Sequence, residues 1–155
     1  MLSSVVRLVR LPLVLLVIWT AIRFTLGVSG VPYAPRGNAM FSVFGLSLIS
    51  SIYFGALSAR TGGFNWLGTI LIGVVIGFCA QSLIFIATLI SYLGGFENSY
   101  FIHWDALNVP EDTVAPMAKG MTTRAAGLFF GSLPPAIAAV IGRLLSTLAP
   151  KPSPA

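Results

Sequence analysis

Charged side chains are scarce in this 155-residue sequence, which has 9 lysines and arginines, 4 aspartates and glutamates and 1 histidine. Charged residues make up 8% of the chain, against about 25% in a typical soluble domain. A soluble particle of this size could not cover its surface with so few polar groups, so an ordinary soluble domain is excluded. The basic residues stand singly, without the basic face or run that binds nucleic acid, so we expect no nucleic-acid partner.

Cysteine and histidine are each present once. Cys79 lies in an apolar run, where it cannot form a disulfide within the chain, and we interpret it as a small buried hydrophobe. The histidine lies outside the apolar runs, so we expect no haem or chlorophyll ligand inside them. His103, Asp105, Glu111 and Asp112 do not have the spacing of a standard metal site. We therefore predict no metal, no catalytic residue and no cofactor, although a lipid, quinone or pigment could bind at a helix surface.

Apolar residues form long runs, and 56% of the chain is hydrophobic with a mean hydropathy of +0.92. A helix that crosses the hydrocarbon core of a bilayer, about 30 Å thick, needs about 20 apolar residues, and lipid-exposed runs must be helical. The sequence therefore predicts an all-α integral membrane protein, a compact bundle of four transmembrane helices. The predicted parts are an N-terminal segment 1–10, one domain 11–148 with helices 11–28, 39–59, 66–93 and 125–148, and a flexible tail 149–155.

The basic residues also predict an orientation, because lysine and arginine concentrate on the cytoplasmic side of membrane proteins. With the N-terminus inside, five basic residues lie inside and three outside. The inner residues are Arg7, Arg10, Arg60, Arg143 and Lys151, and the outer ones are Arg36, Lys119 and Arg124. We therefore predict both termini to be cytoplasmic, with the polar loop 94–124 outside. The short loops fit a bacterial inner membrane.

Small residues recur at four-residue spacing in three of the predicted helices. Such stripes let membrane helices approach closely. The candidate packing residues are Ser47, Ser51 and Gly55, then Gly73 and Gly77, then Gly127 and Gly131. We expect them to close the bundle within the chain; the alternative is that one stripe docks a helix of another protein. In the fourth helix, Pro134 and Pro135 predict a kink or local unwinding.

Two polar residues fall inside the apolar runs. Arg23 lies in the first run, where a charged side chain is costly and often functional. Its guanidinium could reach the lipid headgroups, pair with Glu97 or Asp105, or serve transport or a cofactor. Gln81 lies near the middle of the third run, where its amide needs a partner in a neighbouring helix or a ligand.

All four carboxylates and the histidine fall within residues 97–112. Tyr100, Trp104 and Leu107 recur there at helical spacing, which predicts a short interfacial helix or turn with its aromatic rings at the membrane surface. We select four residues of this loop as candidate partner contacts: Tyr100, His103, Trp104 and Asp105. The shorter loop 30–37, stiffened by two prolines, is expected to pack beneath it.

These patterns favour a non-catalytic accessory or structural subunit of a larger membrane complex, with an energy-transducing complex as one candidate. Its expected partners are membrane lipids and other membrane protein subunits. The main alternative is a small homo-oligomeric channel or transporter, lined by Gln81, the mid-span serines, Arg23 and the kink at Pro134 and Pro135. A lipid-modifying enzyme that uses His103 is a third, less favoured class, because no nucleophile or oxyanion arrangement accompanies that residue.

Overall fold

The computed structural model describes residues 1–33, 42–60, 63–110 and 113–148, of which 78% are helical and none belongs to a strand. The helices are α1 (Leu2–Leu8), α2 (Arg10–Val28), α3 (Val43–Arg60), α4 (Trp66–Leu93), α5 (Trp104–Leu107), α6 (Met117–Phe130) and α7 (Leu133–Leu148). Several predicted features lie outside the described residues: the tail 149–155, the start of the helix 39–59, Arg36, Glu111 and Asp112.

Among the described residues, four stretches are long and apolar enough to cross a membrane. They are Arg10–Val28, Val43–Arg60, Trp66–Leu93 and Met117–Leu148, and the last combines α6 and α7. The predicted all-helical chain with four apolar helices of membrane-spanning length is therefore confirmed. Only 22% to 33% of each stretch is buried within the chain, so most of its apolar surface needs lipid or another protein to cover it.

The fourth stretch differs from its prediction at both its start and its middle. α6 begins at Met117 rather than at the predicted Ala125. Thr122 and Thr123, the expected start signals, lie inside the helix, where their hydroxyls donate to carbonyls one turn earlier. The predicted kink is confirmed as a break between α6 and α7. Pro134 and Pro135 occupy the first turn of α7, where the missing amide donors are not needed.

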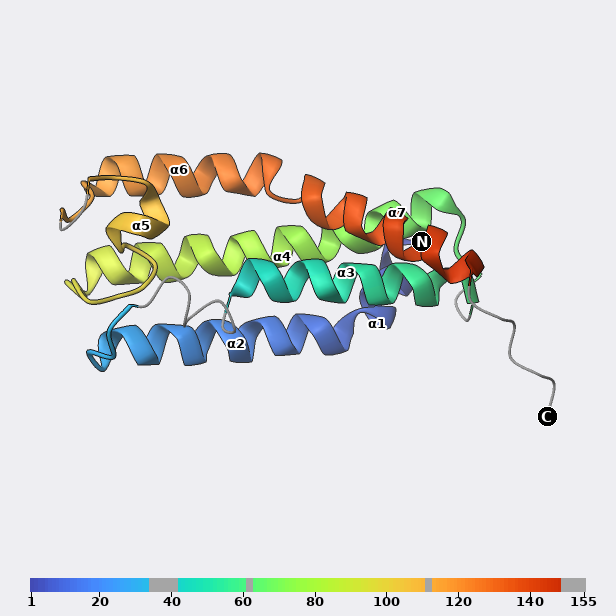
Figure 1. Ribbon diagram of the computed structural model, residues 1–155, viewed down its shortest axis with the longest axis horizontal. Helices are drawn as coiled ribbons and strands as arrows, with labels where there is room; N and C mark the ends of the chain where they lie inside the picture. The colour runs from blue at the N-terminus through green and yellow to red at the C-terminus, as the bar shows by residue number, and fades with distance from the viewer. Residues whose placement is uncertain (34–41, 61–62, 111–112, 149–155) are drawn as a thin grey trace.

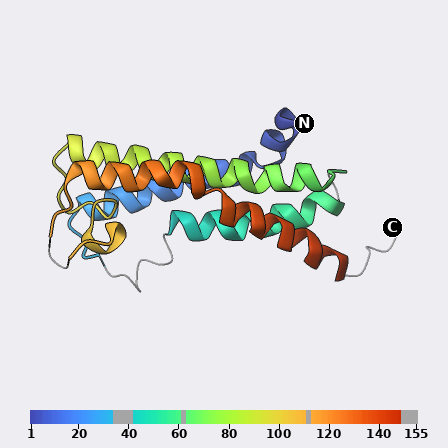
Figure 2. The same ribbon diagram turned by 90° about the horizontal axis from the view of Figure 1, so that it is seen from above.

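α4 is the central helix of the bundle and contacts α1, α2, α3, α6 and α7. α3 begins partway along α4, so it covers only one half of the bundle, where it packs on α7 (Figure 1). The loop between α4 and α6 folds over the other half, beside the end of α2. α1 and the end of α7 lie at the opposite end of the molecule (Figures 1 and 2).

The N-terminal segment contains a helix that the sequence did not predict. α1 ends at Leu8, and α2 begins at Arg10 at an angle to it (Figure 2). Pro12 falls in the first turn of α2, where proline is tolerated. Val5 and Val9 are fully buried and pack in one cluster with Leu16 and Ile72. This segment therefore contributes to the core.

Candidate functional site: the cap and the two-arginine pocket

Residues 94–110, which we call the cap, are fixed to the helices by buried polar contacts. The hydroxyls of Ser91 and Ser99 lie 2.6 Å apart. The hydroxyl of Tyr100 donates to the carbonyl of Val31 at 2.7 Å, which ties the cap to the end of α2. Gly27 allows this close approach, because a Cβ there would lie 2.8 Å from the backbone nitrogen of Tyr100. The cap is thus anchored to both α2 and α4.

The interior of the cap differs from the predicted interfacial helix. Only Trp104–Leu107 are helical, and Tyr100 and Phe101 are buried with exposed fractions of 1% and 2%. Their rings therefore lie inside the protein, where the Tyr100 hydroxyl finds carbonyl acceptors. His103 precedes α5, and its Nδ1 accepts a hydrogen bond from the Asp105 amide at 3.3 Å.

Tyr33 brings the predicted contact residues of the cap together. Its ring stacks on His103 at 4.0 Å and meets the ring of Tyr100 edge-on at 5.3 Å. His103 in turn lies 5.1 Å from the ring of Trp104. The Tyr33 hydroxyl donates to Asp105 Oδ2 at 3.2 Å. Tyr100 is buried, His103 and Trp104 are half-buried, and Asp105 is exposed, so only part of the predicted contact set is accessible.

Burial raises the pKa of the Tyr33 phenol above its usual value of 10.0. The nearby Arg23 guanidinium opposes this shift, since a positive charge favours the phenolate. The Asp105 carboxylate adds to it by repulsion and by accepting the phenolic hydrogen bond. Sequence analysis did not select Tyr33 as a site residue. The one pattern that could have indicated it is its position in the loop 30–37, which was expected to pack beneath the cap.

Arg23 points beneath the cap toward aromatic rings. Its guanidinium carbon lies 5.6 Å from the ring centre of Tyr33, 5.5 Å from Tyr100 and 5.9 Å from Phe101. Such cation–π contacts favour a guanidinium that is partly removed from water. Asp105, one of its two predicted acidic partners, receives the hydrogen bond of Tyr33, so the ring of Tyr33 links the arginine to the carboxylate.

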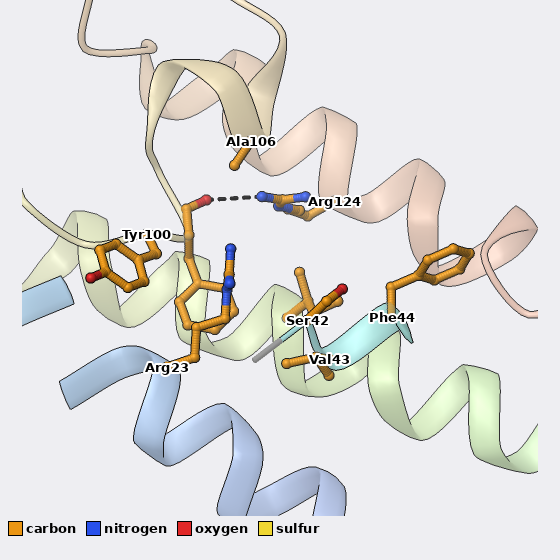
Figure 3. A pocket seen from close by; sticks show the side chains of 9 residues that line it. Arg23, Ser42, Val43, Phe44, Tyr100, Ala106 and Arg124 are labelled. Atoms are coloured by element: carbon orange, nitrogen blue, oxygen red, sulfur yellow. Dashed lines mark hydrogen bonds between the residues drawn. The ribbon is translucent and has the colours of Figure 1, made fainter. Parts of the chain in front are cut away.

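Arg124, on α6, faces the same space as Arg23. Its Nε donates to Thr88 Oγ1 at 3.3 Å, and its Nη2 donates to the Phe101 carbonyl at 3.0 Å. Figure 3 shows Arg23 and Arg124 extending toward one another from opposite sides. Sequence analysis treated Arg124 only as an orientation signal. Arg124 lies three residues before Gly127 and seven before Gly131, which is the spacing of one helix face. A helix predicted to begin at Met117 would therefore have placed Arg124 on the packing face of α6.

The two arginines line a cavity of about 110 Å³, which we call the two-arginine pocket. Ser42, Val43 and Phe44, at the start of α3, form another wall (Figure 3). The Ser42 hydroxyl accepts a hydrogen bond from the Gly45 amide at 3.1 Å, so it caps this helix. The pocket lies at the start of α3, against Tyr100, Phe101 and Ala106 of the cap.

The predicted small-residue stripes lie between helices of this chain. A Cβ at Gly55 would overlap the Ala139 backbone of α7, and one at Gly73 would overlap the Pro135 carbonyl. The other stripe glycines also contact neighbouring segments of this chain. Gly77 lies against Ser132 and Pro135, and Gly127 and Gly131 lie against the side chain of Gln81. Ser47 and Ser51 are fully buried, and their hydroxyls donate to carbonyls of α3 itself.

A third arginine, Arg143, lies at the opposite end of the bundle. Its Nη1 donates to the Phe64 carbonyl at 2.6 Å and to Thr69 Oγ1 at 2.7 Å, and its guanidinium carbon lies 4.6 Å from the Trp66 ring centre. These contacts fasten α7 to the start of α4. Arg143 is therefore engaged by neighbouring protein groups on several sides.

Comparisons with known proteins found no matching family model, no matching curated protein and no matching solved structure. Within the described residues, no group of histidine, cysteine and acidic side chains could hold a metal ion. The cap and the pocket beneath it therefore have to be interpreted from their own chemistry.

Proposed function

We propose that this chain is a non-catalytic subunit of a larger membrane assembly and that it contacts its partner through the cap. The observation that carries this proposal is the aromatic cluster of Tyr33, His103 and Trp104, in which Tyr33 stacks on His103, with the exposed Asp105 beside it. Aromatic side chains are enriched at protein interfaces. A loop that is already ordered loses little conformational entropy when it binds.

The charge of the cap indicates the chemistry of the partner. All the carboxylates of the chain lie within residues 97–112, and the exposed Glu97 and Asp105 belong to the cap. Opposite charges across an interface guide association and fix its register. We therefore expect a partner loop that carries lysine or arginine.

The helix surfaces support the use of the cap rather than the small-residue stripes. Those stripes are occupied by contacts within the chain, such as Gly55 against Ala139. The alternative of a homo-oligomeric channel would use Gln81, Arg23 and the proline kink. We prefer the subunit role because Gln81 packs against the glycines of α6, and the two prolines begin α7.

The test is extraction of the native membrane in mild detergent, followed by native electrophoresis and mass spectrometry of the band that contains this chain. We expect stable co-migration with other subunits, and loss of it in the Asp105→Lys and Trp104→Ala variants. Tyr53→Ala is the matched control, because it truncates an exposed aromatic side chain on α3, outside the cap. Migration of the native chain alone, or equal loss in the control, would contradict the proposal.

A further inference from the structure

We propose that the two-arginine pocket is a binding site for a phosphate group, supplied either by a lipid headgroup or by a soluble phosphate. This site is separate from the partner contact on the exposed side of the cap. It is defined by Arg23 from α2, Arg124 from α6 and the first turn of α3, which come from distant parts of the chain (Figure 3).

Positive charge converges on the pocket from two side chains. Arg23 and Arg124 both line the cavity and extend toward one another across it (Figure 3). The hydrogen bonds of Arg124 go to a hydroxyl and a carbonyl, both neutral, so these contacts orient its guanidinium without balancing its charge. Arginine presents several donors in a planar fork that suits phosphate oxygens. An anion between the two groups would turn their repulsion into attraction.

The start of α3 adds a third favourable element. α3 has 18 residues, and Ser42, Val43 and Phe44 at its start line the pocket. The first amides of a helix have no acceptors within it, and its dipole places partial positive charge there. Helix N-termini therefore bind phosphates readily. Here the helix end faces the same cavity as both guanidinium groups.

The size of the pocket fits such a group. Its volume of about 110 Å³ is several times the roughly 10–15 Å³ that one water needs in a cavity. The remaining walls include Ile84 and Phe101, whose apolar side chains would keep much of the water away. Hydrogen bonds between an arginine and an anion are stronger in such surroundings than in water.

The depth of the pocket explains why an anion would matter. α4 has 28 residues and is about 42 Å long, so a hydrocarbon core about 30 Å thick and centred on it leaves about 6 Å at each end. Thr88, whose hydroxyl accepts a hydrogen bond from Arg124 Nε, lies about 8 Å before the end of α4, and thus about 2 Å inside that core. A guanidinium group at the edge of the core is less well hydrated than in water, so an adjacent phosphate charge is favourable there.

The experiment uses the full chain in two forms. In the lipid arm, the protein is placed in vesicles of the phosphate-free lipid digalactosyldiacylglycerol, with or without phosphatidic acid, then extracted, and its retained lipids are measured by mass spectrometry. In the soluble arm, the protein in the phosphate-free lipid alone is titrated with inorganic phosphate, with chloride as the control anion, and its thermal stability is followed. Preferential retention of phosphatidic acid identifies a lipid headgroup, and stabilisation by phosphate identifies a soluble ligand.

We expect Arg23→Gln and Arg124→Gln each to weaken the measured binding roughly 10-fold to 100-fold. Arg124→Lys should weaken it less, because it keeps the charge and loses only the fork. Arg143→Gln is the matched control, since it removes an arginine at the other end of the bundle, and it should leave binding unchanged. Binding in neither arm, or equal weakening by Arg143→Gln, would overturn the proposal.

A measurement on the unaltered chain protects the test against variants that do not fold. Phenylglyoxal modifies accessible arginines, and mass spectrometry locates the adducts. Bound phosphate or phosphatidic acid should slow the modification of Arg23 and Arg124 relative to Arg143. Equal rates for all three arginines with and without either probe would count against the site.

Discussion

The helices meet backbone to backbone in the half of the bundle where α3 packs on α7, whereas a loop and its side chains fill the other half. In the first half, Gly55 lies against Ala139, and Gly142 lies against the Ile52 carbonyl. In the second half α3 is absent, and the cap folds over α2 and α4 through Tyr100 and the Ser91–Ser99 contact. The first arrangement makes a tight scaffold, and the second leaves a pocket that a ligand can fill.

The arginines of the two halves differ in the same way. Arg143 donates to a carbonyl and a hydroxyl and stacks on Trp66, so neighbouring groups of the protein surround it. Arg23 and Arg124 share a cavity and face one another across it. An arginine can thus fasten helices together or provide a binding surface, and the neighbouring backbone decides which role it takes.

The largest effect is expected where the backbones touch. Gly55→Ala would force a Cβ into the Ala139 backbone and push α3 away from α7. We expect the free energy of unfolding to fall by about 3 kcal/mol or more, measured by denaturant titration in detergent micelles. Gly45→Ala is the control on the same helix, because its Cβ would lie at an ordinary distance of 3.4 Å from Ser42 Cβ. Similar losses for the two variants would show that the tight contact does not matter.

Removal of the fastening arginine should have the next largest effect. Arg143→Gln breaks hydrogen bonds from a charged group to Phe64 and Thr69, so we expect a loss of about 1.5–3 kcal/mol in the free energy of unfolding. This loss should be independent of phosphate, whereas the stability difference between the native chain and Arg124→Gln should grow as phosphate or phosphatidic acid is added. A phosphate-dependent loss in Arg143→Gln would remove the distinction between the two halves.

A smaller effect is expected within the cap. Tyr100→Phe removes the hydrogen bond from the phenol to the Val31 carbonyl and leaves the ring in place. We expect a loss of about 1 kcal/mol and faster amide hydrogen exchange in residues 94–107. Tyr53→Phe is the control, since the Tyr53 side chain is 61% exposed on α3. Unchanged exchange in the cap would mean that Tyr100 does not anchor it.

The smallest effect concerns the ionisation of Tyr33. Because its pKa is raised in the folded protein, the neutral phenol contributes stability that is fully present below pH 10.0, the usual value, and is lost as pH rises through the folded pKa. Ultraviolet titration should therefore show a late-ionising phenol component, and this component should shrink by one phenol in Tyr33→Phe. A late component of unchanged size in the variant would show that Tyr33 does not contribute to it.

Sequence analysis found the elements of this fold that depend on local signals. The predicted helix 66–93 has the same bounds as α4, with Asn65 capping its start: the side chain of Asn65 accepts the Gly68 amide at 2.8 Å. Pro134 and Pro135 predicted a distortion of the helix, and the helix is interrupted just before them, between α6 and α7. Helix α1 was missed because seven residues are too few to span a membrane, and it is held by tertiary contacts of Val5.

The composition and the apolar runs by themselves determined an all-helical chain with four membrane-length apolar helices, because run length, caps and prolines act within a few residues. Only the tertiary structure decided that Arg23 and Arg124 meet over one pocket, because they lie on helices far apart in the sequence. Their meeting depends on where α3 begins and on the cap folding inward over α2. No local pattern encodes these two features, since each follows from how the helices pack.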